Sequence, residues 1–244
     1  MVLLILLTTS AAWAAHSDWQ EGQFLSGGKP VSEHHCAPST PGVHPAVILL
    51  HGGAGYGPGE FDIENLCSDL TERGYYVESI EYFSQSGGEL GPFTGDEVAN
   101  APIFMREVES GIDALGKNAA VDSKRIGMMG YSYGATLSLA IGAQEPEKIA
   151  AIVDYYGKLP PQLEPRAGNL PPTLIMHGGS DDFIPVANAR RLDTLMTSAN
   201  RPHEVHIFPG LGHGFNFKGS AVCPADPCLR FLDEHLNPGT ASTP

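Results

Sequence analysis

The chain has 244 residues, of which 42% are apolar and 17% are charged. This balance fits one domain or at most two small ones. It excludes a chain that is disordered throughout, because enough apolar side chains are present to fill a core. The formal net charge of −14 argues against nucleic acid as a partner, since binding phosphates needs a basic surface.

The N-terminus has the pattern of an export signal. Residues 2–7 are an uninterrupted apolar run, and Ala12-Trp13-Ala14 fits the A-x-A cleavage pattern. The run is too short to cross a bilayer. We therefore expect a signal peptide over residues 1–14 and a periplasmic or secreted protein without a membrane span. The segment lacks the usual Lys or Arg before the apolar run, so a buried apolar N-terminal segment is the alternative.

Export makes disulfides possible, and the chain has four cysteines, an even number. Cys223 and Cys228 flank a short turn-like segment, so we expect the pairs Cys36–Cys67 and Cys223–Cys228. Buried free thiols are the alternative. A zinc site is disfavoured because metal ligands need clustered histidines or close cysteine pairs, which His34-His35-Cys36 matches poorly. We expect no metal and no cofactor.

Strands and helices are expected to alternate along the chain. Residues 24–36, with Gly27-Gly28 in the middle, predict an antiparallel hairpin at a sheet edge. Apolar runs and helical spacing then predict strands over residues 46–50, 75–80, 125–129, 149–153, 173–176 and 205–208, and helices over residues 61–73, 103–115, 133–143, 186–196 and 228–236. This alternation is typical of a parallel, doubly wound α/β sheet. We expect a single domain over residues 15–244.

The first candidate for chemistry is Gly130-Tyr131-Ser132-Tyr133-Gly134, a G-x-S-x-G motif. The motif alone is weak, but here a predicted strand leads into it and a predicted helix leads out. This is the setting of a nucleophile elbow, a tight turn that holds a serine hydroxyl above the sheet. The alternative is a serine that merely caps the following helix.

A serine nucleophile needs a base, and the base needs an orienting acid, in the chain order Ser, Asp, His for this architecture. Asp181 and Asp182 follow the strand at 173–176, and His213 lies in a glycine-rich loop after the strand at 205–208. The oxyanion formed during acyl transfer needs backbone N–H donors. Tyr133, next to the nucleophile, is the first candidate. Gly53 and Ala54, in the glycine-rich loop after the strand at 46–50, are the others. A plain glycine-rich turn is the alternative for that loop.

The motifs HGGAG, GYSYG, HGGSDDFIP and FPGLGHGF, in this order, resemble the dienelactone hydrolase family of α/β-hydrolases. The resemblance covers about residues 22–236 and implies the α/β-hydrolase fold. In the family's motif the catalytic acid stands four residues after the histidine. This implies Asp181 as the acid, with Asp182 as the second choice. Two departures, Ser132 in place of the family's cysteine and no glutamate near the end of the strand at 46–50, favour a general ester hydrolase over a dienelactone hydrolase.

We therefore expect a serine hydrolase that cleaves small carboxylic esters through Ser132, His213 and Asp181 and an acyl-enzyme. A lactone hydrolase with serine in place of cysteine, and a non-catalytic binding protein on the same fold, are the alternatives. The substrate is expected to be a small ester or lactone, and the protein a monomer or homodimer. Lys158, Arg166 and Lys218 could meet a substrate carboxylate or be merely solvated. Five aromatic residues could line the acyl site or pack in the core, namely Tyr131, Tyr133, Tyr155, Tyr156 and Phe215.

Overall fold

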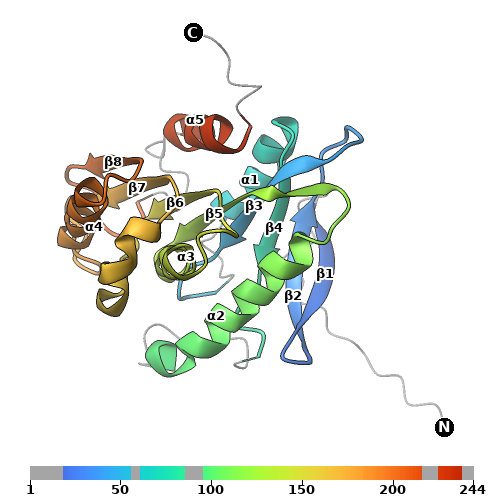
Figure 1. Ribbon diagram of the computed structural model, residues 1–244, viewed down its shortest axis with the longest axis horizontal. Coiled ribbons are helices and arrows are strands. Elements are labelled where there is room, and N and C mark those ends of the chain that lie inside the picture. The colour runs from blue at the N-terminus through green and yellow to red at the C-terminus, as the bar shows by residue number, and fades with distance from the viewer. Residues whose placement is uncertain (1–18, 56–60, 86–95, 216–224, 238–244) are drawn as a thin grey trace.

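A computed structural model describes residues 19–55, 61–85, 96–215 and 225–237. In these ranges eight strands form one sheet in the order β1-β2-β4-β3-β5-β6-β7-β8 (Figure 1). Their bounds are β1 Gln20–Ser26, β2 Lys29–Cys36, β3 His44–Leu50, β4 Tyr76–Ile80, β5 Val121–Tyr131, β6 Ala151–Tyr155, β7 Thr173–Gly178 and β8 His203–Phe208. Strands β1, β2 and β4 pair antiparallel, and all the other pairs are parallel. The expected mostly parallel α/β sheet with an N-terminal hairpin is confirmed.

Helices cover both faces of the sheet. They are α1 Phe61–Glu72, α2 Asp96–Leu115, α3 Tyr133–Gln144, α4 Ala187–Ser198 and α5 Ala225–Leu236, together with the 3₁₀ helix η1, Pro161–Asn169. Helices α2, α3 and α4 lie on one face and α1 and α5 on the other (Figure 1). Each face has its own apolar cluster, with Phe104, Leu137 and Leu192 in the first and Leu70 and Leu232 in the second. The two clusters explain why β3, between them, is apolar at consecutive positions.

Two elements differ most from the sequence expectation. Helix α2 begins at Asp96, before the predicted start at residue 103, and contains Pro102. A proline inside a helix removes one backbone hydrogen bond, and packing of the helix against its neighbours outweighs that loss. The second element is η1, which contains Pro165 and lies in a stretch for which no helix is predicted. Helices of the 3₁₀ type serve as connectors between larger elements, as η1 does here between β6 and β7.

A disulfide joins β2 to α1. Cys36 and Cys67 are bonded, with their Cα atoms 6.1 Å apart and 31 positions of sequence between them. This confirms the first expected pair. Cys228 is buried in α5, but Cys223 lies outside the described residues, so the pair Cys223–Cys228 stays a prediction. The expected signal peptide over residues 1–14 also lies outside them. No helix of the described ranges is both long and apolar enough to cross a membrane.

Candidate active site

Ser132 lies at the turn between β5 and α3 with a backbone φ of +54°. A non-glycine residue in this region is strained by about 1–3 kcal/mol and persists only where its surroundings hold it. Here the Ser132 N–H donates to the carbonyl of Tyr155 at 2.9 Å, and the Ser132 carbonyl accepts from the N–H of Thr136 at 3.0 Å. Ser132 makes no side-chain cap of α3. The geometry is therefore that of the elbow and not that of a capping serine.

The two glycines of the motif are required by close packing around the elbow. A Cβ atom on Gly130 would collide with the backbone of Gly134 and Ala135. A Cβ atom on Gly134 would collide with the carbonyl oxygens of Leu50 and His51 at the end of β3. The G-x-S-x-G spacing thus follows from how tightly the turn packs against itself and against the neighbouring strand.

The structure brings Ser132, His213 and Asp181 together in one hydrogen-bonded chain, although they come from separate loops. His213 Nε2 lies 2.9 Å from Ser132 Oγ, and His213 Nδ1 lies 2.8 Å from Asp181 Oδ2. The imidazole ring also packs between Tyr156 and Phe183, at centroid distances of 4.7 and 4.9 Å. These contacts orient both ring nitrogens toward their partners, an arrangement that can move a proton away from a serine hydroxyl.

Asp181 is the carboxylate that the fold aims inward. Its Oδ1 accepts the backbone N–H groups of Phe183 and Ile184 at 2.9 and 2.8 Å, while Oδ2 faces His213. The neighbouring Asp182 is exposed. The structure thus distinguishes the two adjacent acids by position, because only the first of them contacts the histidine.

A second histidine, His177, lies against Asp181. It is fully buried, and its Nε2–H donates to the carbonyl of Ile184 at 2.7 Å. The same nitrogen lies 3.3 Å from Asp181 Oδ2. Burial lowers the pKa of His177, which favours the neutral ring near physiological pH. The histidine of the HGGSDD motif therefore anchors the loop that carries Asp181.

The glycine loop after β3 is tied to the elbow through His51. This buried histidine donates from Nδ1 to the Gly52 carbonyl at 2.7 Å and stacks on Tyr82 at 4.0 Å. Burial lowers its pKa to about 4, so the ring is neutral near pH 7. Tyr82 Oη donates to the His51 carbonyl at 2.6 Å. Gly53 is buried and Ala54 is exposed in this loop. The contacts of His51 and Tyr82 thus fix the start of the loop that carries Gly53 and Ala54, two of the expected oxyanion donors.

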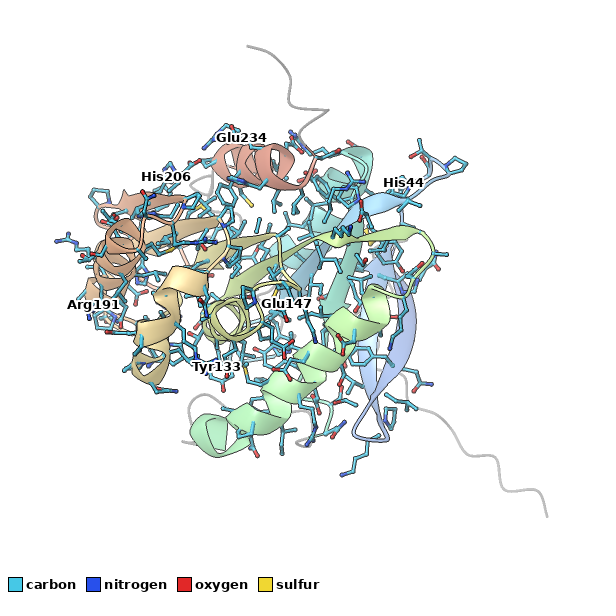
Figure 2. All side chains as sticks on the ribbon, in the orientation of Figure 1. His44, Tyr133, Glu147, Arg191, His206 and Glu234 are labelled. Carbon is cyan, nitrogen blue, oxygen red and sulfur yellow. A yellow bond between two sulfur atoms is a disulfide. The ribbon has the colours of Figure 1, made fainter. Side chains whose placement is uncertain are left out.

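A cavity of about 560 Å³ opens beside Ser132, within the range typical of small-molecule sites. It is lined mostly by apolar side chains. The described lining residues are Ala101, Met105, Ser132, Tyr133, Thr136, Leu137, Ala140, Gln144, Lys158, Pro160, Pro161, Gln162, Leu163, Phe183 and Ile184. Tyr133 stands at the start of α3 on the side toward α2 (Figure 2), where its ring meets Phe104 at 6.0 Å.

The structure also shows where the other residues that the sequence singled out are placed. Of the five aromatic residues, Tyr133 lines the cavity, and the remaining four are buried in the apolar cluster on the opposite face of the sheet. Of the three cations, Lys158 lines the cavity, Arg166 is not in its lining, and Lys218 lies outside the described residues. The His34-His35-Cys36 stretch is spread over different contacts. His34 meets Glu81, His35 meets Glu33, and Cys36 is in the disulfide.

Sequence reasoning named few of the individual residues of the cavity wall. Ala101 and Met105 come from the part of α2 around Pro102, and Pro160 to Leu163 come from the residue before η1 and the start of η1. Phe183 is 45% exposed although it is large and apolar. Its position in the HGGSDDFIP motif, next to the expected acid, was the one available signal that it lies at the site.

A family model described as "Dienelactone hydrolase family" matches residues 33–227. The carboxymethylenebutenolidase of Rhodococcus opacus is 25% identical over 201 residues, covering 72% of this chain and 77% of that protein. The dienelactone hydrolase of Anabaena variabilis superposes with a TM-score of 0.71 at 20% identity, covering 90% of this chain and all of that one. A dienelactone hydrolase-like promiscuous phosphotriesterase from metagenomic libraries gives 0.75 at 14% identity, covering 89% and 96%. At these identities the two structures support the fold alone.

Proposed function

Because the chain belongs to the dienelactone hydrolase family and is therefore a hydrolase of the ester or lactone type, we propose that it is a serine hydrolase of small carboxylic esters. Ser132 is the nucleophile, His213 the general base and Asp181 the orienting acid. The observation that carries the proposal is the continuous chain from Ser132 Oγ through His213 to Asp181, with links of 2.9 and 2.8 Å. It starts at a serine held in a strained backbone conformation.

The proposed reaction has two halves. Ser132 Oγ attacks the ester carbonyl while its proton moves to His213 Nε2, and the new Oγ–C bond makes a tetrahedral oxyanion. Collapse breaks the C–O bond to the alcohol, which leaves with the proton from His213, and an acyl-enzyme remains. Water, deprotonated by His213, then attacks the acyl carbonyl, and the proton returns to Ser132 as the acid leaves.

The groups around Ser132 have supporting roles in this proposal. Asp181 holds His213 with Nδ1 protonated, which leaves Nε2 able to accept the serine proton, and it stabilises the imidazolium. The N–H of Tyr133 and that of Gly53 or Ala54 bind the oxyanion, where one such donor typically contributes about 3–4 kcal/mol.

The two alternative functions, a lactone hydrolase and a non-catalytic binding protein, are not equally well supported. A lactone hydrolase is supported by the name of the Rhodococcus opacus relative, and the same acyl-transfer steps would open a lactone. A non-catalytic binding protein is less well supported, because the fold would have no need to hold all three side chains at hydrogen-bonding distance. Reactivity of Ser132 therefore separates enzyme from binding protein, and paired ester and lactone substrates separate the two hydrolases.

Export belongs to the same proposal. The apolar run and the A-x-A pattern before His16 support a cleaved signal over residues 1–14. The Cys36–Cys67 disulfide is consistent with an oxidising compartment. Mass spectrometry of the protein from periplasm and medium should find a new N-terminus after Ala14 or Ala15. An intact Met1 on the mature protein would contradict it.

The experiment that tests the function is labelling with a fluorophosphonate, followed by a screen of p-nitrophenyl esters. We expect labelling of Ser132 and turnover that both disappear in Ser132→Ala. Ser198→Ala, which changes an exposed serine of α4, is the matched control and should behave like the unmodified protein. Ester turnover retained by Ser132→Ala would refute the nucleophile.

A further inference from the structure

The cavity beside Ser132 follows one face of α3. Its lining includes Tyr133, Thr136, Leu137, Ala140 and Gln144, which are separated by three, one, three and four positions. Residues at such spacing stand above one another on a single side of a helix. From the first to the last of them the helix rises about 16 Å, at about 1.5 Å per residue. The cavity therefore runs along the helix, away from the nucleophile.

Two further elements enclose this path. Ala101 and Met105 of α2 form part of the wall, and the start of η1, with Leu163, forms another. The 3₁₀ helix is held at both sides. Asn169 Nδ2 donates to the Ala143 carbonyl of α3 at 3.1 Å, and Arg191 of α4 pairs with Glu164 at 2.6 Å. Figure 2 labels Arg191 at α4, on the side of the molecule where η1 lies. The part of the cavity wall that η1 forms is thus fixed to α3 and α4 by contacts within the fold.

Polar groups lie toward the two ends of the path. Lys158 is the one charged residue among the described lining residues, and its backbone N–H donates to Thr136 Oγ1 at 3.2 Å, which places its backbone near the Ser132 end. Gln144 lies at the far end of the α3 face. Between them the α3 face presents Leu137 and Ala140. An apolar chain that enters this stretch leaves water, and each methylene buried there favours binding by about fourfold.

The position of His213 indicates which part of an ester, the acyl group or the alcohol group, enters the cavity. The proposed reaction needs the leaving alcohol oxygen next to His213 Nε2, at the N-terminal end of α3, to receive its proton. Among the described lining residues, Ser132 and Phe183 contact His213, whereas the path along α3 runs from Ser132 in the direction of Gln144. The group that lies along α3 is therefore the acyl group, attached to Ser132 in the acyl-enzyme.

We propose that the α3 cavity is an acyl-chain channel and that the preferred substrates are esters of linear, apolar acids of about six to ten carbons. The inference rests on the proposed function and narrows its substrate class. An extended chain advances about 1.25 Å per carbon, given C–C bonds of about 1.5 Å, so the 16 Å path accepts no more than about twelve carbons. Activity should rise from acetate to octanoate and fall beyond dodecanoate.

The test compares p-nitrophenyl acetate, butyrate, octanoate and decanoate in wild type and Ala140→Phe. Side chains on a helix lean toward its N-terminus, so a phenyl ring at 140 would close the channel about one turn earlier, near Leu137. The kcat/KM ratio of octanoate to butyrate should fall about 10- to 100-fold, as expected from several lost methylene contacts. Leu163→Trp, at a half-buried position of η1, narrows the channel from the other side and should act in the same direction. It serves as a second test if Ala140→Phe does not fold.

The matched control is Ala199→Phe, at an exposed position outside the cavity lining, and its ratio should equal that of wild type. Ethyl octanoate should be a better substrate than octyl acetate. A preference for octyl acetate, a decline in wild-type activity from acetate onward, or ratios unmoved by both channel variants would overturn the acyl channel. With turnover still dependent on Ser132, the proposed function would stand. Turnover that persists in Ser132→Ala would overturn the function itself.

Discussion

Two buried carboxylates at different places in the sheet show how surroundings decide what an acid can do. Asp181, beyond the end of β7, and Glu78, within β4, are both 6% exposed. Asp181 accepts two backbone N–H groups and faces His213. Glu78 has its Oε1 buried without a hydrogen-bond partner. Burial, with a smaller effect of the nearby Glu33, raises the pKa of Glu78 to about 8.

The comparison extends to the regions around the two acids. The loops after β5, β7 and β8 converge on polar groups that are held by directed hydrogen bonds, which is what a proton relay needs. At the β2–β4 pair the ionisable groups take part in packing. Glu78 lies opposite His35 in the strand pair, His35 bonds Glu33 and stacks on Tyr76, and the disulfide ties β2 to α1. Variants in the first region should change catalysis, and variants in the second should change stability.

The largest expected effect is in the relay itself. Ser132→Ala and His213→Ala should each lower kcat by about 10⁵- to 10⁶-fold, and the double variant should be little worse than either, because the groups act as one unit. Steady-state kinetics on one activated ester measures all three. Losses that multiply in the double variant would show that the two residues act independently and would contradict the relay.

The next effect separates the two adjacent acids. Asp181→Asn would place an amide N–H₂ or force a new tautomer against His213 Nδ1, and kcat should fall by about 10⁴-fold. Asp182→Asn changes an exposed side chain and should stay within about twofold. Both variants keep their size and should melt near the wild-type temperature. A severe loss in Asp182→Asn with a mild one in Asp181→Asn would show that the wrong carboxylate was assigned.

These two predictions could be made from the sequence because each residue follows a recognisable strand. Ser132, Asp181 and His213 each lie just after an apolar run, and parallel strands bring such loops to one edge. The individual residues of the cavity wall could not be predicted in this way, since Met105 and Leu163 reach it only through the packing of α2 and η1 against α3. The protonation state of Glu78 could not be predicted from the sequence either. Its strand is partly polar in sequence, and only the pairing of β4 with the hairpin strand β2 shows that the carboxyl is buried.

The third prediction concerns the pH dependence of stability. Below pH 4.5, the ordinary pKa of a glutamate, Glu78 is protonated in both states and has no effect. Between pH 4.5 and about 8 the unfolded chain loses the proton while the folded one keeps it, so the free energy of unfolding falls as pH rises. From pH 5 to 8 the free energy of unfolding of the wild type should fall by about 4 kcal/mol more than that of Glu78→Gln.

Urea unfolding at pH 5, 6.5 and 8 measures this difference. Glu147→Gln, at an exposed position of the loop after α3 (labelled in Figure 2), is the matched control and should keep the wild-type slope. If Glu78→Gln and wild type lose stability in parallel, Glu78 is ionised in the folded protein and the contrast with Asp181 disappears. The kcat of Glu78→Gln at pH 7 should match that of wild type, since the carboxyl lies away from the relay.

The smallest of the expected effects comes from the disulfide that ties β2 to α1. Cys36 and Cys67 are 31 positions apart, and closing a loop of that size stabilises a fold by about 3–4 kcal/mol through the entropy of the unfolded chain. The double variant Cys36→Ala/Cys67→Ala should lose about this much in urea unfolding, as should wild type treated with a reductant.

Reductant acting on the double variant then reports a second bond, the predicted pair Cys223–Cys228. Its loop is shorter, so its loss should be smaller. The kcat/KM of the double variant, measured well below its melting temperature, should stay close to that of wild type. A drop in kcat/KM with the fold intact would mean that the β2–α1 tie also positions the catalytic loops, and the division of the sheet into a catalytic and a structural region would then be wrong.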